Sequence, residues 1–154
     1  MPADSEPAGP VALPHTWRPL GVRVAGTVFG GGLVLVCAAT WIGFDSETQG
    51  KFTLFQRLTL VFVALLAFSL WFALVRSRVV GEADRLVVVN GYRRHEFAWA
   101  QVVAVRLPPG APWVTLDLAD GTTVSAMGIQ GSDGDRARRA VRELRAVADQ
   151  QIGL

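Results

Sequence analysis

Two long uncharged segments constrain this chain more than any other feature of its sequence. Residues 24–44 and 58–75 contain no Asp, Glu, Lys or Arg, and they are 21 and 18 residues long. As helices they would measure roughly 30 and 27 Å, close to the hydrocarbon thickness of a bilayer. Charged residues make up only 18% of the 154 residues, below the share of an ordinary soluble domain. The sequence therefore predicts a two-helix transmembrane hairpin over residues 21–75.

Interfacial side chains accompany both segments. Aromatic residues gather toward their ends, where a ring can meet both lipid and water; they are Trp17, Trp41, Phe44, Phe55, Trp71 and Phe72. A cleaved signal peptide is the competing interpretation of the first segment, with cleavage near Ala38 or Ala39. We favour a span, because the apolar run exceeds the 7–15 residues that are typical of a signal peptide.

Basic residues near the span ends indicate an orientation. Arg18 and Arg23 precede the first segment, and three more follow the second, whereas Lys51 and Arg57 are the basic residues of the connecting loop. Since basic residues collect on the cytoplasmic side, five against two predicts that both termini are cytoplasmic. Arginine outnumbers lysine by fourteen to one, as in proteins of high-GC bacteria. We therefore expect a multi-pass protein of the bacterial plasma membrane.

Glycines in the first segment allow close helix packing. Gly26 and Gly30 form a GxxxG pair, which suits either a homo-oligomer or packing within one chain. We favour packing against the second segment, at Ala64, Ala67 and Ser69. A homo-oligomer formed through Gly26 and Gly30 remains the alternative. The interior of each segment lacks ionisable residues, so autonomous transport is not expected.

The segments before and after the predicted spans differ from them in composition and in the periodicity of their apolar residues. Prolines interrupt residues 1–20, and we predict a disordered tail there. Beyond residue 75, apolar alternation and turn dipeptides predict about six strands, at 78–82, 86–89, 92–97, 102–107, 114–118 and 122–127. Asn90-Gly91 is a strong hairpin signal. A last helix is predicted after a Ser132–Asp135 capping box, with one apolar stripe.

This order of elements resembles a known family. The resemblance rests on 85–91, on Phe97-Ala98-Trp99-Ala100-Gln101-Val102, on 114–121 and on the last helix. The chain resembles bacterial PH-domain proteins with two N-terminal membrane spans, of the type called low molecular weight protein antigen 6. The resemblance covers roughly residues 18–148. It implies a membrane hairpin followed, over 76–150, by a PH-like α+β domain whose antiparallel strands form a barrel or sandwich capped by one helix.

The resemblance implies a binding module and no reaction. PH domains of eukaryotes often bind phosphoinositides through basic residues around the loop joining their first two strands. Here we place that loop at residues 81–84, which include two acids, so phosphoinositide recognition is not expected. Bacterial members of the fold resemble protein-interaction modules. We expect Trp99 to anchor the core.

The residues themselves offer little chemistry. His95 and His15 have no nucleophile or orienting acid in a recognisable motif, so we expect no enzyme. Two histidines and Cys37 are a poor zinc ligand set, and no cofactor or metal is expected. The formal net charge of +2 argues against a nucleic-acid partner.

Two function hypotheses remain. The first is a non-catalytic scaffold or protein-interaction module at the inner membrane face, with a membrane or envelope protein as partner. The second is a sensor or binder of anionic lipid headgroups. The candidate interaction or lipid-facing residues are Arg76, Arg78, Arg85, Arg93, Arg94 and Trp113. Trp113 is either an exposed anchor or a core residue.

Overall fold

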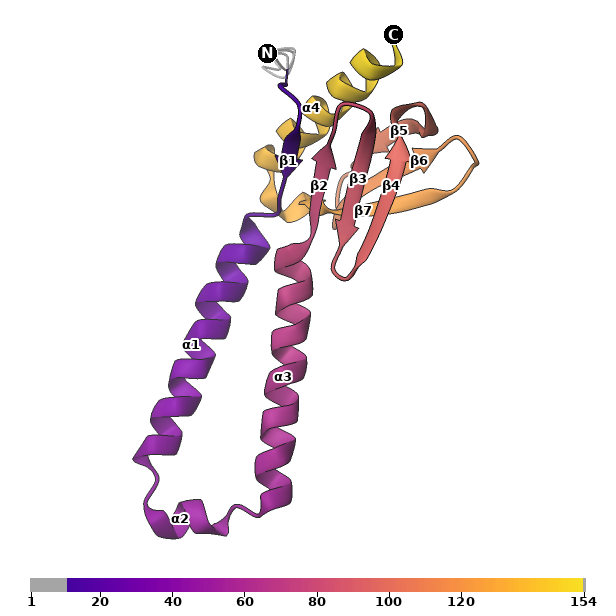
Figure 1. Ribbon diagram of the computed structural model, residues 1–154. Coiled ribbons are helices and arrows are strands. Elements are labelled where there is room, and N and C mark those ends of the chain that lie inside the picture. Colours follow the sequence, from indigo (N-terminus) through magenta and orange to yellow (C-terminus); the bar gives the residue numbers. More distant parts are fainter. Residues whose placement is uncertain (1–10, 154) are drawn as a thin grey trace.

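Two long helices project from a small β-rich domain (Figure 1). The computed structural model describes residues 11–153. Helix α1 covers Gly21–Gly43 and helix α3 covers Leu54–Arg76, and both are long and apolar enough to cross a membrane. Neither has a buried residue. An apolar helix with no buried face is not the core helix of a soluble domain, so these helices support membrane association.

The two helices approach each other near the domain and separate toward their far ends (Figure 1). A Cβ on Gly26 would lie 2.8 Å from the Trp71 ring, whereas nothing lies within 4 Å of one on Gly30. Gly26 therefore packs against the second helix, as expected, but its neighbour there is Trp71 and not Ala64, Ala67 or Ser69. Ala64 and Ala67 are exposed.

Aromatic side chains close the far end of the hairpin. A short helix, α2 (Ser46–Lys51), connects the two long ones. The rings of Trp41 and Phe52 are 5.4 Å apart, and Phe44 stacks on Phe52. The Arg57 guanidinium lies over Trp41 and donates a 2.7 Å hydrogen bond to the Gln49 carbonyl. The connection is therefore an ordered turn.

Seven antiparallel strands form two sheets. The first sheet has the order β1-β2-β3-β4, with bounds His15–Trp17, Arg78–Gly81, Arg85–Asn90 and Arg93–Ala98. A 3₁₀ turn, Trp99–Gln101, leads to the second sheet. That sheet has the order β5-β6-β7, with bounds Val102–Arg106, Trp113–Leu118 and Thr123–Gln130. The six predicted strands are all present, and residues 11–153 contain no closed barrel.

The seventh strand comes from the segment predicted to be disordered. Within residues 1–20, His15–Trp17 pairs with β2, with His15 opposite Gly81 and Trp17 opposite Val79. Trp17 is only 5% exposed, and its Nε1 donates to Glu143. Burial of a large ring offsets the entropy cost of ordering the segment, and the proline pattern does not reveal this. Residues 1–10 lie outside the described part.

The hairpin is inserted into the β domain. Strand β1 precedes α1 and strand β2 follows α3, yet the two strands are neighbours in one sheet. The domain predicted over 76–150 therefore also takes a strand from before the first span.

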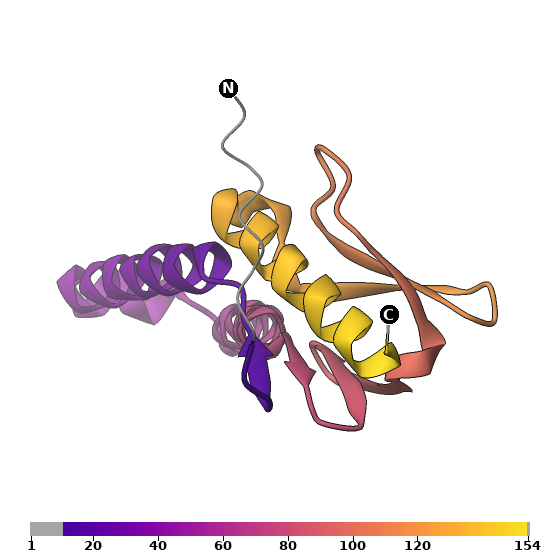
Figure 2. The same cartoon turned by 90° about the horizontal axis from the view of Figure 1, so that it is seen from above.

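One amphipathic helix packs on the sheets (Figure 2). Helix α4 covers Asp135–Ile152, and its buried side chains are Ala137, Val141, Leu144, Val147 and Ala148. The predicted stripe is therefore correct. The predicted capping box is wrong, because the N-cap is Gly134, without a side-chain cap, and Ser132 lies in a preceding 3₁₀ turn.

The two sheets meet where β7 crosses β2. A Cβ on Gly128 would lie 2.5–2.6 Å from backbone atoms of Arg78 and Val79. Such a distance is too short for any side chain, so this crossing requires glycine. The Asn90 side chain links the sheets further, donating to the Ser125 carbonyl and accepting a 2.9 Å bond from the Met127 amide.

Candidate functional site

The β3–β4 turn fixes the domain to the end of α3. The Tyr92 hydroxyl lies 2.8 Å from Ser69 Oγ and donates a 3.1 Å bond to the Ser69 carbonyl. The Gly91 amide donates to Ser77 Oγ, which donates in turn to the Ala73 carbonyl. Since Ser69 and Ala73 belong to the second apolar helix, this turn marks the end of the domain nearest the candidate spans, which we call the membrane-proximal end.

A second attachment holds the start of α1. The Asp133 carboxylate accepts hydrogen bonds from the backbone amides of Leu20, at 2.9 Å, and Gly21, at 2.8 Å. The first amides of a helix have no partner within the helix, and a carboxylate there also suits the helix dipole. Asp133 precedes α4 by two residues in the sequence, yet its side chain caps α1.

Three of the five candidate arginines gather at this membrane-proximal end. Arg76 ends α3 and Arg78 begins β2, while Arg93 follows the β3–β4 turn opposite Asn90. None of the three forms an ion pair within residues 11–153. They therefore retain charge and hydrogen-bond donors for a partner.

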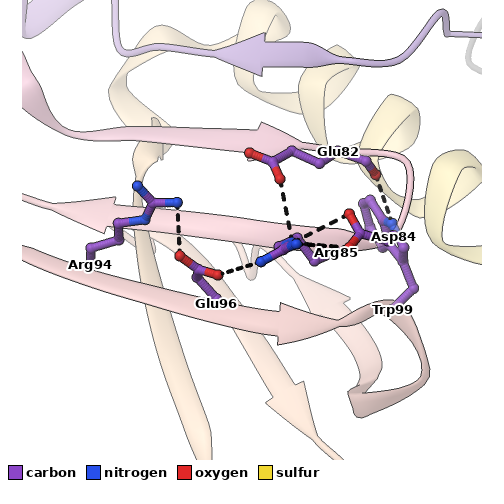
Figure 3. Close-up of polar contacts among 6 residues, drawn as sticks. All are labelled: Glu82, Asp84, Arg85, Arg94, Glu96 and Trp99. Atoms are coloured by element: carbon purple, nitrogen blue, oxygen red, sulfur yellow. Dashed lines mark hydrogen bonds and ion pairs between the residues drawn. The ribbon is translucent and has the colours of Figure 1, made fainter.

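The other two arginines belong to a separate ion-pair cluster (Figure 3). Arg85 starts β3, at the end of that strand opposite to the turn on α3, and it contacts three carboxylates. The distances are 2.8 Å to Glu96, 2.9 Å to Asp84 and 3.4 Å to Glu82. Arg94 contacts Glu96 at 2.7 Å. The structure thus does not bring Arg85 and Arg94 to the membrane-proximal group.

The cluster shifts the acids toward their charged forms. A hydrogen bond from Arg85 lowers the pKa of Asp84. The pKa of Glu96 is lowered first by the hydrogen bond from Arg85 and then by the charge of Arg94. The pKa of Arg85 rises further above its ordinary value for the same reason. The β2–β3 connection is thus a charge-compensated turn without a free basic cluster.

The tryptophans divide between core and edge. Trp99 is buried, as expected, and its Nε1 donates a 2.9 Å bond to the Glu82 carbonyl (Figure 3). Trp113 is half-buried at the start of β6, opposite Gln130. It is therefore neither a full core residue nor a free anchor. His95 is exposed on β4.

An open cleft between β1 and α4 was missed by sequence reasoning. Its volume is about 450 Å³, and His15, Arg18, Gly128, Asp133, Arg136, Arg139 and Glu143 are among its lining residues. No motif marks these residues, because β1 and α4 come from opposite ends of the chain. Two arginines of α4, Arg136 and Arg139, contribute to this lining.

The comparisons agree with this architecture. Residues 76–146 match the family model described as "Bacterial PH domain". Uncharacterized proteins of Mycobacterium bovis and Mycobacterium tuberculosis are 32% identical over 142 residues, which is 89% of this chain and 86% of each relative. No solved structure matches the chain. Two packed sheets with a C-terminal helix, interrupted after β1 by an apolar hairpin, define a PH-type domain with candidate membrane spans. The chain belongs to the bacterial PH-domain family, as the resemblance implied.

Proposed function

We propose that this protein is a non-catalytic, membrane-anchored interaction module. Its PH-like domain would bind a membrane or envelope protein at the inner face of the plasma membrane. The observation that carries the proposal is the insertion of the hairpin between two paired strands, β1 and β2. Because the chain enters and leaves the hairpin through one sheet, the domain is held against the bilayer in one orientation.

A fixed orientation suits a binding surface. Tethering raises the effective concentration of a weak module near partners in the same membrane. Strand β4 forms one edge of the first sheet, and five of its six side chains are exposed. Arg93, Arg94, His95 and Glu96 lie along that edge. An exposed edge strand with mixed charge is a surface that another protein can pair with or contact.

In-cell photo-crosslinking tests this proposal. A photoreactive residue in place of His95 is expected to capture one reproducible protein of the membrane fraction. The control replaces Asp120, which is exposed in the β6–β7 turn away from β4. A reproducible adduct from His95 alone supports a β4 interface. No adduct, or equal capture from both positions, contradicts it.

Anionic headgroup binding is the second candidate function. The unpaired Arg76, Arg78 and Arg93 at the membrane-proximal end favour it, since each such charge contributes about 1 kcal/mol near an anionic leaflet. To test this candidate, the full chain is purified and the number of phosphatidylglycerol molecules bound to each protein is measured by native mass spectrometry. Replacing all three arginines by Gln is expected to lower that count. An unchanged count contradicts this candidate at these three residues.

A further inference from the structure

The cleft between β1 and α4 is an open site with the volume of a small-ligand pocket. Its volume of about 450 Å³ lies in the range of pockets that hold drug-sized molecules. Gly128 and Ile129, from the end of β7, also line it. Both are buried, so the cleft has a well-packed base.

The acidic side chains that line the cleft are already engaged. Asp133 accepts from the amides of Leu20 and Gly21. Glu143 accepts a 2.9 Å hydrogen bond from Trp17 Nε1. Asp135 lies 3.4 Å from Arg138, on the outside of the helix. These contacts hold the carboxylates in place but leave their charge, so an anion in the cleft would have to be bound by its basic side chains.

The basic side chains of the cleft are not engaged. Arg18 approaches from the β1 side, and Arg136 and Arg139 approach from successive turns of α4. Within residues 11–153 none of the three forms an ion pair. Each guanidinium offers up to five N–H donors in a fork that matches phosphate oxygens. The donors left over in this cleft therefore suit a phosphate group.

The position of the cleft indicates which kind of molecule would carry that phosphate, namely a membrane lipid. The Asp133 carboxylate, which lines the cleft, is bound to the first residues of α1. Gly21 precedes the uncharged run from Val24 by three residues, or about 4.5 Å along a helix axis. The headgroup layer of one leaflet is about 5–8 Å thick. The cleft thus opens at headgroup depth, beside the helix.

We propose that this cleft binds the phosphate headgroup of an anionic phospholipid through Arg18, Arg136 and Arg139. The proposal rests on the second candidate function, headgroup binding, and assigns it a specific site. This site lies on β1 and α4, apart from the β2–β3 loop that the family resemblance indicated. It differs from general attraction to the leaflet because the three charges line one cleft.

Two single variants form the central test. Arg139→Gln removes a charge that lines the cleft, and Arg142→Gln removes an exposed charge from the same helix, three residues on and outside the cleft. The full chain, purified in detergent, is titrated with phosphatidylglycerol or phosphatidylcholine and read by native mass spectrometry. We expect Arg139→Gln to weaken phosphatidylglycerol binding about fivefold and Arg142→Gln to have much less effect. Arg136→Gln with Arg139→Gln is expected to weaken it further.

Other outcomes would overturn the proposal. Equal losses from Arg139→Gln and Arg142→Gln would indicate bulk charge, and equal binding of both lipids would remove the anion preference. Displacement of phosphatidylglycerol by inorganic phosphate would indicate a site for a soluble anion. Loss of binding only in the variant at Arg76, Arg78 and Arg93 would keep headgroup binding but exclude the cleft. Unfolding temperatures of all variants, measured in the same detergent, separate loss of a site from loss of the fold.

Discussion

The Asp133 carboxylate accepts a 2.8 Å hydrogen bond from the backbone amide of Gly21, 112 residues earlier in the chain. Helix caps usually come from the residue next to the helix. Here the cap comes from the far end of the sequence, so a residue of the β domain also stabilises the start of the first candidate span. A Cβ on Gly21 would lie 2.7 Å from Asp133 Oδ1, so a larger residue there would displace the capping carboxylate.

Replacing Asp133 by Ala is expected to lower the free energy of unfolding by about 1 kcal/mol, the usual cost of a lost cap. Denaturant unfolding in detergent measures it, and hydrogen exchange at Leu20 and Gly21 should become faster. Asp135→Ala serves as the control, because Asp135 is exposed and its one ion pair within residues 11–153 is with Arg138. A larger loss from Asp135→Ala would contradict the assigned cap.

Gly128 is expected to tolerate no side chain. In Gly128→Ala the new methyl group would collide with the backbone of β2, so we expect a loss of about 1–3 kcal/mol or failure to fold. Gly32→Ala is the matched control, since nothing lies within 4 Å of that position. Thermal unfolding of both variants checks the prediction. Similar stability of the two would show that β7 and β2 are not in contact.

Trp17 is expected to stabilise the domain although it precedes both spans. Trp17→Ala should cost about 3–5 kcal/mol, because it leaves a cavity and frees Glu143. Trp17→Phe keeps most of the buried surface and loses the Nε1 bond, at a cost of about 1 kcal/mol. Denaturant unfolding measures the free energy of unfolding of both variants. Wild-type stability of Trp17→Ala would mean that β1 is not part of the domain.

The ion pairs around Arg85 are expected to make the stability of the domain depend on pH. Because Arg85 lowers the pKa of Asp84 and of Glu96, the stability from these pairs is present near neutral pH and is lost as the pH falls through the lowered values. In Arg85→Gln both pKa values should rise. That of Glu96 should stay partly lowered, since Arg94 remains beside it. Titration of the carboxyl carbons by NMR measures both, and unchanged values would contradict the cluster.

Topology is the prediction with the widest consequence. A compartment-specific reporter placed after Leu154 should be active only in its cytoplasmic form, since basic residues favour that side. Protease added outside spheroplasts should cut only near α2 (Ser46–Lys51). Activity of the exported reporter alone would place the domain outside the cytoplasm.

Local sequence patterns predicted the helices and most strands well, but they did not predict which segments pack or pair with one another. The uncharged runs indicated both long helices, Asn90-Gly91 indicated a turn, and the apolar stripe of α4 indicated its buried face. Strand β1 was missed because three residues among prolines carry no periodic signal. Its stability comes from pairing with β2 and from the burial of Trp17. The cleft was missed for the same reason, since one wall is β1.

Placing a membrane hairpin between two paired strands also affects the order of synthesis. When β1 leaves the ribosome its partner does not yet exist, and β2 becomes available only after α3 has been made. If one span failed to insert, β1 and β2 would lie on opposite sides of the bilayer and the first sheet could not close. Pairing of β1 with β2 therefore requires that the two spans cross the bilayer together or not at all, and a chain with a single crossing would expose unpaired strands to cellular quality control.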